Sequence, residues 1–420
     1  MEERISKIFT GVLKRELVPA LGCTEPIAVA YAAAKAREVL GEFPERIEIE
    51  CSGNIVKNVM GVTVPNSDGM KGIGAAAVLG VTGGDASEEL EVLNKVTQED
   101  IARTKELLAQ GFYKGSLQSG VDNLYIVARV YKGEHSAAVT IINRHTLITD
   151  IEKDGKQLYH RDPIRKKEET DWSEWSIEKI IEYANCEIDP EVRALIEQQV
   201  ECNTRISQYG LCHPIGARVG STLLRTEGNY VAVRARAKAA AGSDARMGGC
   251  AMPVVINSGS GNQGMTVCMP VVEYGKEYGS DPETICRALI ISNLVSIYQK
   301  HFIGSLSAFC GAVSAAAGAG AGITYLVGGT HDQICHTIIN TMANVGGIIC
   351  DGAKASCAAK IAAAVEAATL GHSLSMQGHV FLPGEGIVKQ DIEETIRAIG
   401  YIGKLGMKET DETILHIMMN

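Results

Sequence analysis

The chain is poor in aromatic residues and in positive charge. Only 5% of its 420 residues are Phe, Trp or Tyr, and its formal net charge is −10. A chain with this charge lacks the basic surface that binds phosphate backbones, and the same deficit disfavours anionic membrane surfaces. We therefore expect neither nucleic acid nor a membrane as its partner.

A secretion signal and a clear membrane span are also missing. The N-terminus begins Met-Glu-Glu-Arg, without the basic-then-apolar order of a signal peptide. We therefore expect a cytoplasmic protein whose 12 cysteines are not a disulfide framework. Residues 302–330 carry no charge and are long enough to cross a bilayer, but they are rich in Gly, Ala and Ser, which supply little transfer energy. This stretch is expected to form closely packed, buried helices.

The order of the local patterns predicts an α+β protein in two parts. Helical patterns at 4–18, 24–40, 73–81 and 99–110 are mixed with strand patterns at 46–50, 62–64, 124–130, 137–142 and 147–151. Charged residues crowd positions 161–172, which indicates a boundary between a mixed α/β domain (1–165) and a second domain (166–420). The second domain is predicted to be mainly helical, with helices at 176–184 and 190–208.

Three cysteines lie among small residues: Cys310 in Phe-Cys-Gly-Ala, and Cys350 and Cys357 in Cys-Asp-Gly-Ala-Lys-Ala-Ser-Cys. A Gly-rich backbone can wrap closely around an iron–sulfur cluster, and three thiolates would leave one iron open as a Lewis acid. Residues seven apart on one straight helix are separated by about 10.5 Å along its axis, so Asp351-Gly352 must interrupt any helix between the last two cysteines. From spacing alone, inert buried cysteines remain an open alternative. A closed zinc site is disfavoured because no Cys-x₂-Cys pair is present.

Cys23 immediately precedes a predicted helix. Thr24 is expected to cap this helix, and Glu25 and Pro26 suit its first turn. The positive end of the helix is expected to stabilise a thiolate at Cys23 and to lower its pKa, as a nucleophile or general base requires. A small buried residue beside a cap is the alternative interpretation.

Residues 256–266 form a polar, Gly-rich segment that contains the dinucleotide pattern G-x-G-x-x-G at Gly259, Gly261 and Gly264. Because Pro270 follows soon and no clear βαβ unit surrounds the pattern, nucleotide binding is the weaker interpretation. An anion pocket is favoured, in which backbone N–H groups and the side chains of Ser258, Ser260 and Asn262 hold a substrate carboxylate.

Two further polar segments are candidates for substrate binding. The loop at Ser52-Gly53-Asn54 is followed by Lys57, which could neutralise a carboxylate, and by Asn58. His379, in Gln-Gly-His, is the third candidate. A surface lysine and a structural histidine are the respective alternatives.

Four motifs in this order, Leu-Gly-Cys-Thr-Glu-Pro, Ser-Gly-Ser-Gly-Asn-Gln-Gly, Phe-Cys-Gly-Ala and Cys-Asp-Gly-Ala-Lys-x-Ser-Cys, resemble the L-cysteine desulfidase family. That family is related to the α domain of iron–sulfur L-serine dehydratases, and the resemblance covers nearly the whole chain. It implies one [4Fe–4S] cluster per chain, held in the helical domain by Cys310, Cys350 and Cys357. It also implies that Cys23 removes the Cα proton in an oxygen-sensitive β-elimination of L-cysteine to hydrogen sulfide, ammonia and pyruvate.

Two departures from typical serine dehydratases favour desulfidase activity. Their late cysteine pair is more widely spaced, and this chain ends Ile-Met-Met-Asn without a cysteine tail. The alternatives are an iron–sulfur L-serine dehydratase, a pyridoxal-phosphate lyase and a non-catalytic iron–sulfur or thiol-rich binding protein. A homodimer is the expected assembly.

Overall fold

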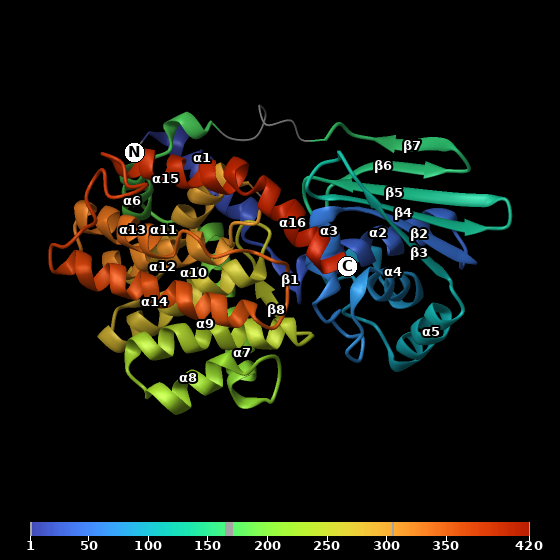
Figure 1. Ribbon diagram of the computed structural model, residues 1–420, viewed down its shortest axis with the longest axis horizontal. Coiled ribbons are helices and arrows are strands. Elements are labelled where there is room, and N and C mark those ends of the chain that lie inside the picture. Colours follow the sequence, from blue (N-terminus) through green and yellow to red (C-terminus); the bar gives the residue numbers. More distant parts are fainter. Residues whose placement is uncertain (1, 164–170, 305, 420) are drawn as a thin grey trace.

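The computed structural model describes residues 2–163, 171–304 and 306–419, with the strands concentrated in one half and most helices in the other (Figure 1). This agrees with the predicted mixture of α and β structure. The boundary proposed between residues 165 and 166 lies outside the described residues.

The first half is built on a six-stranded sheet of order β3-β2-β4-β5-β6-β7. Strand β2 (Arg46–Ser52) pairs in parallel with β3 (Tyr113–Gln118), and the remaining pairs are antiparallel. The other strands are β4 (Tyr125–Lys132), β5 (His135–Ile142), β6 (Ile148–Lys153) and β7 (Lys156–His160). Helices α2 (Thr24–Leu40) and α4 (Gly72–Gly83) pack on this sheet, α4 is followed by α5 (Gln98–Ala109), and the short helix α3 (Gly53–Met60) continues directly from β2.

Several local predictions for this half are confirmed. The strand patterns at 46–50, 124–130, 137–142 and 147–151 all lie on or overlap strands. In the structure, the β6–β7 hairpin turns at Asp154-Gly155, where both residues have positive φ. The pattern at 62–64 is wrong as a strand, because Thr63 makes only an isolated bridge to Lys71. Strands β3 and β7 were not predicted, since both are largely exposed edges without alternating apolar residues.

The second half is a bundle of helices around the uncharged stretch, which forms the buried helix α12 (Gly311–Leu326) as predicted. Small residues allow close packing here: a Cβ on Gly318 would lie 2.3 Å from the Ser292 carbonyl oxygen of α11 (Pro282–Ile303). In the described part of the chain, no helix has both the length and the apolar character needed to cross a membrane. The other helices of this half are α6 (Ile177–Asn185), α7 (Pro190–Cys212), α8 (Val219–Glu227), α9 (Val231–Met247), α10 (Gly261–Tyr278), α13 (His331–Val345), α14 (Cys357–Met376) and α15 (Ile392–Tyr401).

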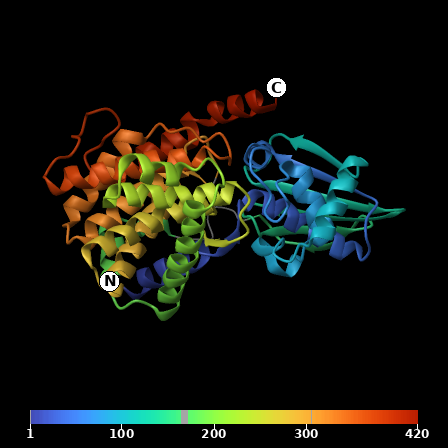
Figure 2. The same ribbon diagram turned by 90° about the horizontal axis from the view of Figure 1, so that it is seen from below.

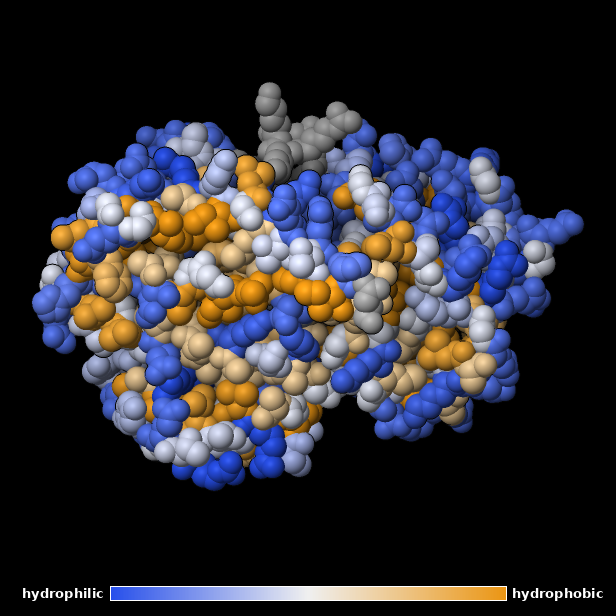
Figure 3. Space-filling model, in the orientation of Figure 1, coloured by the Kyte–Doolittle hydropathy of each residue, from blue (hydrophilic) through white to orange (hydrophobic). Residues whose placement is uncertain are grey.

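The two halves are joined by segments from both ends of the chain. Helix α1 (Glu3–Glu16) packs against α6, α7 and α11 of the helical half, and β1 (Pro19–Leu21) then pairs with β8 (Pro253–Val255). At the other end, the short π-helix η3 (Ile402–Gly406) leads into α16 (Lys408–Met419), which packs on α3 (Figures 1 and 2). Both connections cross close to the cavity described below. Figure 3 shows that apolar patches gather over the helical half, while the surface over the sheet is more hydrophilic.

Candidate active site

A cavity of about 590 Å³ lies where the two halves meet. Residues at the start of five helices line it: Cys23 and Thr24 before and in α2, Asn54 in α3, Ser260 before α10, Cys310 before α12, and Cys357 at the start of α14. A helix N-terminus carries partial positive charge and unpaired N–H groups. Five such ends around one cavity make it suited to anions.

Antiparallel backbone pairing brings two of the predicted cluster cysteines together. Phe309 forms a bridge with Ile349, the Cys310 N–H donates to the Ile348 carbonyl at 3.0 Å, and the Cys350 N–H donates to the Ala308 carbonyl at 2.6 Å. Cys310 and Cys350 are far apart in the sequence, but this pairing makes them neighbours, and both line the cavity.

The third cysteine enters the cavity through a turn. Helix α14 begins at Cys357, so Cys350 lies outside it, and Gly352 between them has a φ of +91°. The predicted interruption at Asp351-Gly352 is thus confirmed. The requirement that Cys350 and Cys357 do not share one unbroken helix is met.

The three thiols form a donor set that fits an iron–sulfur cluster. Burial raises the pKa of Cys310 to about 12, and the neighbouring Cys350 thiol adds to this shift. Small residues, including Gly311, Gly352 and Ala353, line the same part of the cavity. Among the described residues, no three Cys, His, Asp or Glu side chains converge on a single-ion site. In a four-iron cluster each cysteine binds a different iron, so the three thiols need not converge on one point.

We expect Gly352→Ala to destabilise this turn. A Cβ at residue 352 would lie 2.2 Å from the Lys57 carbonyl oxygen, in a backbone conformation that L side chains rarely adopt. The expected cost is about 1–3 kcal/mol, measured as a lower midpoint of thermal unfolding. Gly347→Ala is the matched control, because a Cβ at residue 347 would meet no atom of the described residues within 4 Å. Equal midpoints for the two variants would contradict the expected strain.

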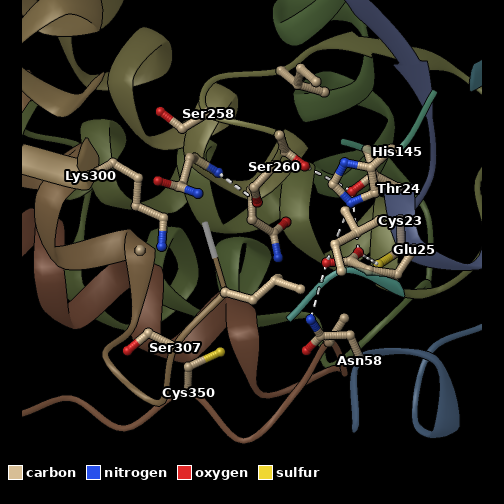
Figure 4. A pocket seen from close by; sticks show the side chains of 18 of the residues that line it. Cys23, Thr24, Glu25, Asn58, His145, Ser258, Ser260, Lys300, Ser307 and Cys350 are labelled. Atoms are coloured by element: carbon tan, nitrogen blue, oxygen red, sulfur yellow. Dashed lines mark hydrogen bonds and ion pairs between the residues drawn. The ribbon is translucent and has the colours of Figure 1, made fainter. Parts of the chain in front are cut away.

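Cys23 lies on the opposite side of the cavity from Cys350 (Figure 4), and it does not behave as predicted. Its Sγ donates a hydrogen bond to Oε2 of Glu25 at 3.0 Å. Burial raises the pKa of Cys23, and the negative charge of Glu25 raises it further, so the prediction of a lowered pKa is wrong. The residue that caps α2 was also mispredicted: Cys23 occupies the N-cap position, while the Thr24 hydroxyl donates to the Gly259 carbonyl at 2.9 Å.

Glu25 is the buried carboxylate at the centre of this group (Figure 4). Besides the Cys23 thiol, Nδ2 of Asn58 donates to its Oε1 at 3.1 Å, and Nε2 of His145 lies 3.9 Å from the same oxygen. Burial alone would raise the pKa of Glu25, but the facing His145 imidazole and the Cys23 thiol outweigh it and lower this pKa to about 2. Glu25 is therefore an ionised hydrogen-bond acceptor for the Cys23 thiol.

The Gly-rich segment 256–266 makes room for side chains instead of a nucleotide. A Cβ on Gly261 would lie 2.4 Å from the Arg246 guanidinium, and one on Gly259 would lie 3.2 Å from Cε1 of His145. Strand β8, which precedes the segment, pairs with β1 in a two-stranded antiparallel sheet, so the βαβ unit of dinucleotide-binding folds does not surround it. The guanidinium of Arg246 donates to the Gly22 carbonyl and to Oδ1 of Asn262, which ties the Cys23 loop to the Gly-rich segment.

The structure brings most of the predicted substrate-binding residues into the cavity, namely Asn54, Lys57, Asn58, Ser258, Ser260 and Asn262. Lys57 and Asn58 lie on helix α3 and not in a loop, and Lys57 is buried and paired with Asp411 of α16. The surface interpretation of Lys57 is therefore wrong. Ser52 and His379 do not line the cavity: the Ser52 hydroxyl donates to the Asn123 carbonyl at 2.6 Å, and His379 is exposed beyond α14.

Five buried polar atoms that line the cavity have no hydrogen-bond partner among the described residues. Three are side-chain amide oxygens, namely Oδ1 of Asn54, Oδ1 of Asn143 and Oε1 of Gln263. The other two are nitrogens, Nε2 of His145 and Nε of Arg246. Buried polar atoms are rarely left unpaired, so this set indicates a polar ligand. Sequence reasoning missed six site residues: Glu25 and Gln263 lie within the quoted motifs but were not assigned to the site, and Asn143, His145, Arg246 and Lys300 lie in no motif.

Comparison with known proteins places the chain in a family. The serine dehydratase alpha chain family matches residues 87–416, and the chain belongs to that family. Relatives of the same length include UPF0597 proteins from three bacteria. That of Lachnoclostridium phytofermentans is 55% identical over 99% of this chain and 100% of its own. Those of Finegoldia magna and Desulfitobacterium hafniense are 51% and 47% identical, over 98% and 100% of this chain and 99% and 98% of their own lengths. The relationship to serine dehydratases inferred from the motifs is confirmed.

Proposed function

We propose that the protein is a [4Fe–4S]-dependent L-cysteine desulfidase, which converts L-cysteine to hydrogen sulfide, ammonia and pyruvate. The observation that carries this proposal is one cavity lined by Cys310, Cys350 and Cys357 together with the hydrogen-bonded Cys23–Glu25 pair, with Cys23 facing Cys350 across it (Figure 4). Membership of the serine dehydratase alpha chain family supports a lyase reaction on a β-substituted amino acid.

Cys310, Cys350 and Cys357 would hold one cluster per chain in the helical half. When bound, the cluster supplies an open iron that acts as a Lewis acid toward the leaving sulfur. The thiols lose their protons on binding, as metal ligation requires. The surrounding helix N-termini of α12 and α14 favour the negative charge that this creates.

The unpaired polar atoms fit the two charged ends of an amino acid. Asn143 lines the cavity, its Nδ2 donates to the Asp122 carboxylate at 3.2 Å, and its Oδ1 is left as an acceptor without a partner among the described residues. With Oδ1 of Asn54, it would accept hydrogen bonds from the α-ammonium group. Arg246, together with Ser258, Ser260 and Asn262 at the start of α10, would hold the α-carboxylate. A substrate held in this way would have its Cα within the cavity that Cys23 lines.

Proton removal falls to Cys23 and Glu25. The Cys23 sulfur takes the proton from Cα as its own thiol proton passes to Glu25 along the 3.0 Å hydrogen bond, so no free thiolate has to form first. The electron pair of that C–H bond forms the Cα=Cβ bond as the Cβ–S bond breaks and sulfide leaves. The aminoacrylate product tautomerises to an imine, and water then releases ammonia and pyruvate.

The second candidate is an L-serine dehydratase, favoured by the name of the family to which the chain belongs. The experiment that separates the two begins with protein purified without oxygen and assayed for iron and acid-labile sulfide. About four of each per chain are expected for a cubane cluster. Values of kcat/KM for L-cysteine and L-serine then decide between them, and we expect L-cysteine to be preferred.

Other outcomes of this experiment point elsewhere. Activity without iron, even after anaerobic reconstitution, would indicate a pyridoxal-phosphate lyase, for which iron content is a better discriminator than yellow colour. A cluster without turnover of either amino acid would indicate a non-catalytic binding protein. The cytoplasmic location and the homodimer remain predictions.

A further inference from the structure

Lys300 is a buried lysine that faces the cavity. It lies near the end of α11, the residue is 6% exposed, and it lines the cavity. Figure 4 shows its ammonium group directed into the cavity, on the same side as Cys350. Among the described residues, no carboxylate lies within ion-pair distance of Lys300 and no hydrogen bond to its side chain is formed.

The other two buried cations of the cavity have hydrogen-bonding partners, although only Lys57 has a counter-charge and Nε of Arg246 has no partner among the described residues. Lys57 forms an ion pair with Asp411, and Arg246 donates to the Gly22 carbonyl and to Asn262. A buried ammonium group without a counter-charge is costly, and it is normally neutralised or paired. Burial lowers the pKa of Lys300, whereas the nearby thiols of Cys350 and Cys310 act in the opposite direction. The missing counter-charge is therefore expected on the cysteine side of the cavity.

We propose that Lys300 is a positioning residue whose ammonium group is the counter-charge of the metal cluster held by Cys310, Cys350 and Cys357. This inference rests on the proposed function. A cluster with three thiolate ligands is an anion, and in a buried site one fixed positive charge acts on it strongly. The charge of Lys300 favours retention of the anionic cluster, and it favours the reduced form, which carries one more negative charge.

The test compares Lys300→Met, which removes the charge at similar length, with Lys300→Arg, which keeps it. Lys276→Met is the control, because Lys276 lies on neighbouring α10 with a 56% exposed side chain. Iron is followed during incubation with a chelator, without oxygen, and the reduction potential is measured by a titration monitored by electron paramagnetic resonance. We expect Lys300→Met to lose iron about tenfold faster than the wild type, since replacing residues around a metal site typically weakens metal binding by at least that factor. Its cluster should also have a lower reduction potential than that of the wild type. Lys300→Arg and Lys276→Met should stay close to the wild type.

Thermal unfolding of the iron-free proteins provides a second measurement, in which Lys300→Met is expected not to be harmful. Without the cluster, the ammonium group of Lys300 lacks its counter-charge, so Lys300→Met should unfold at the same or a higher temperature than the wild type. A lower midpoint would indicate that Lys300 only supports packing, and the inference would fail. The inference would also fail if the wild type held about four irons per chain and Lys300→Met lost iron at the same rate and had the same reduction potential. If the wild type takes up no iron at all, the proposed function itself fails and this inference fails with it.

Discussion

Replacing Cys350 with alanine is expected to remove the cluster and nearly all activity. Its backbone is fixed against Ala308 beside Cys310, and its thiol lines the cavity with Cys357. Loss of one of three protein ligands leaves a cubane cluster with two, and a Lewis acid contributes several kcal/mol to such a reaction. Since each 1.4 kcal/mol is a factor of ten, turnover should fall by roughly 10³-fold. Iron per chain and sulfide release from L-cysteine are the measurements.

The chain contains a matched control for this experiment. Cys335 is also buried, on α13, but it does not line the cavity. Cys335→Ala should keep its iron and its turnover, which separates loss of a ligand from loss of a buried sulfur. If Cys350→Ala retained full iron content, the ligand assignment would have to be abandoned, together with the placement of the cluster between α12 and α14.

The sequence was informative about this wall of the cavity because its signal is local. Cys310, Cys350 and Cys357 each lie in a segment rich in Gly and Ala, and the Asp351-Gly352 turn could be deduced from helix geometry alone. The pairing of residues 308–310 with 348–350 depends on a single bridge between distant segments, which no local pattern reports. Local composition could therefore single out the three cysteines as candidates and the family resemblance could assign them as ligands, but neither could show how they meet.

The opposite wall was harder to predict because it is assembled from several segments. Glu25 comes from α2, Asn58 from α3, and His145 from the turn between β5 and β6, so none marks the others in the sequence. The error over the pKa of Cys23 has the same origin. The argument from the helix end considered only the local dipole, whereas burial and the charge of Glu25 dominate. Edge strands β3 and β7 were missed because exposed edges carry little apolar alternation.

Glu25→Gln is expected to make Cys23 more reactive and the enzyme less active. The charge of Glu25 and its hydrogen bond both raise the pKa of the Cys23 thiol, so removing the charge should lower this pKa and increase the thiolate fraction at a given pH. Alkylation of Cys23 by iodoacetamide in the iron-free protein, followed by mass spectrometry of its peptide, should therefore be faster. Turnover of L-cysteine should fall by about 10²–10⁴-fold, since an amide cannot accept the thiol proton.

These two opposite changes distinguish a proton acceptor from a structural residue. A glutamate that only shaped the first turn of α2 would, on replacement by the isosteric glutamine, leave turnover nearly unchanged. Glu16→Gln is the control, because Glu16 also lines the cavity but pairs with Arg15 at its edge. Exchange of the substrate Cα proton with deuterated water gives an independent readout of the same step. If Glu25→Gln slowed neither exchange nor turnover, proton transfer from Cys23 to Glu25 would be refuted, and the Cα proton would have to be taken by another group in the cavity.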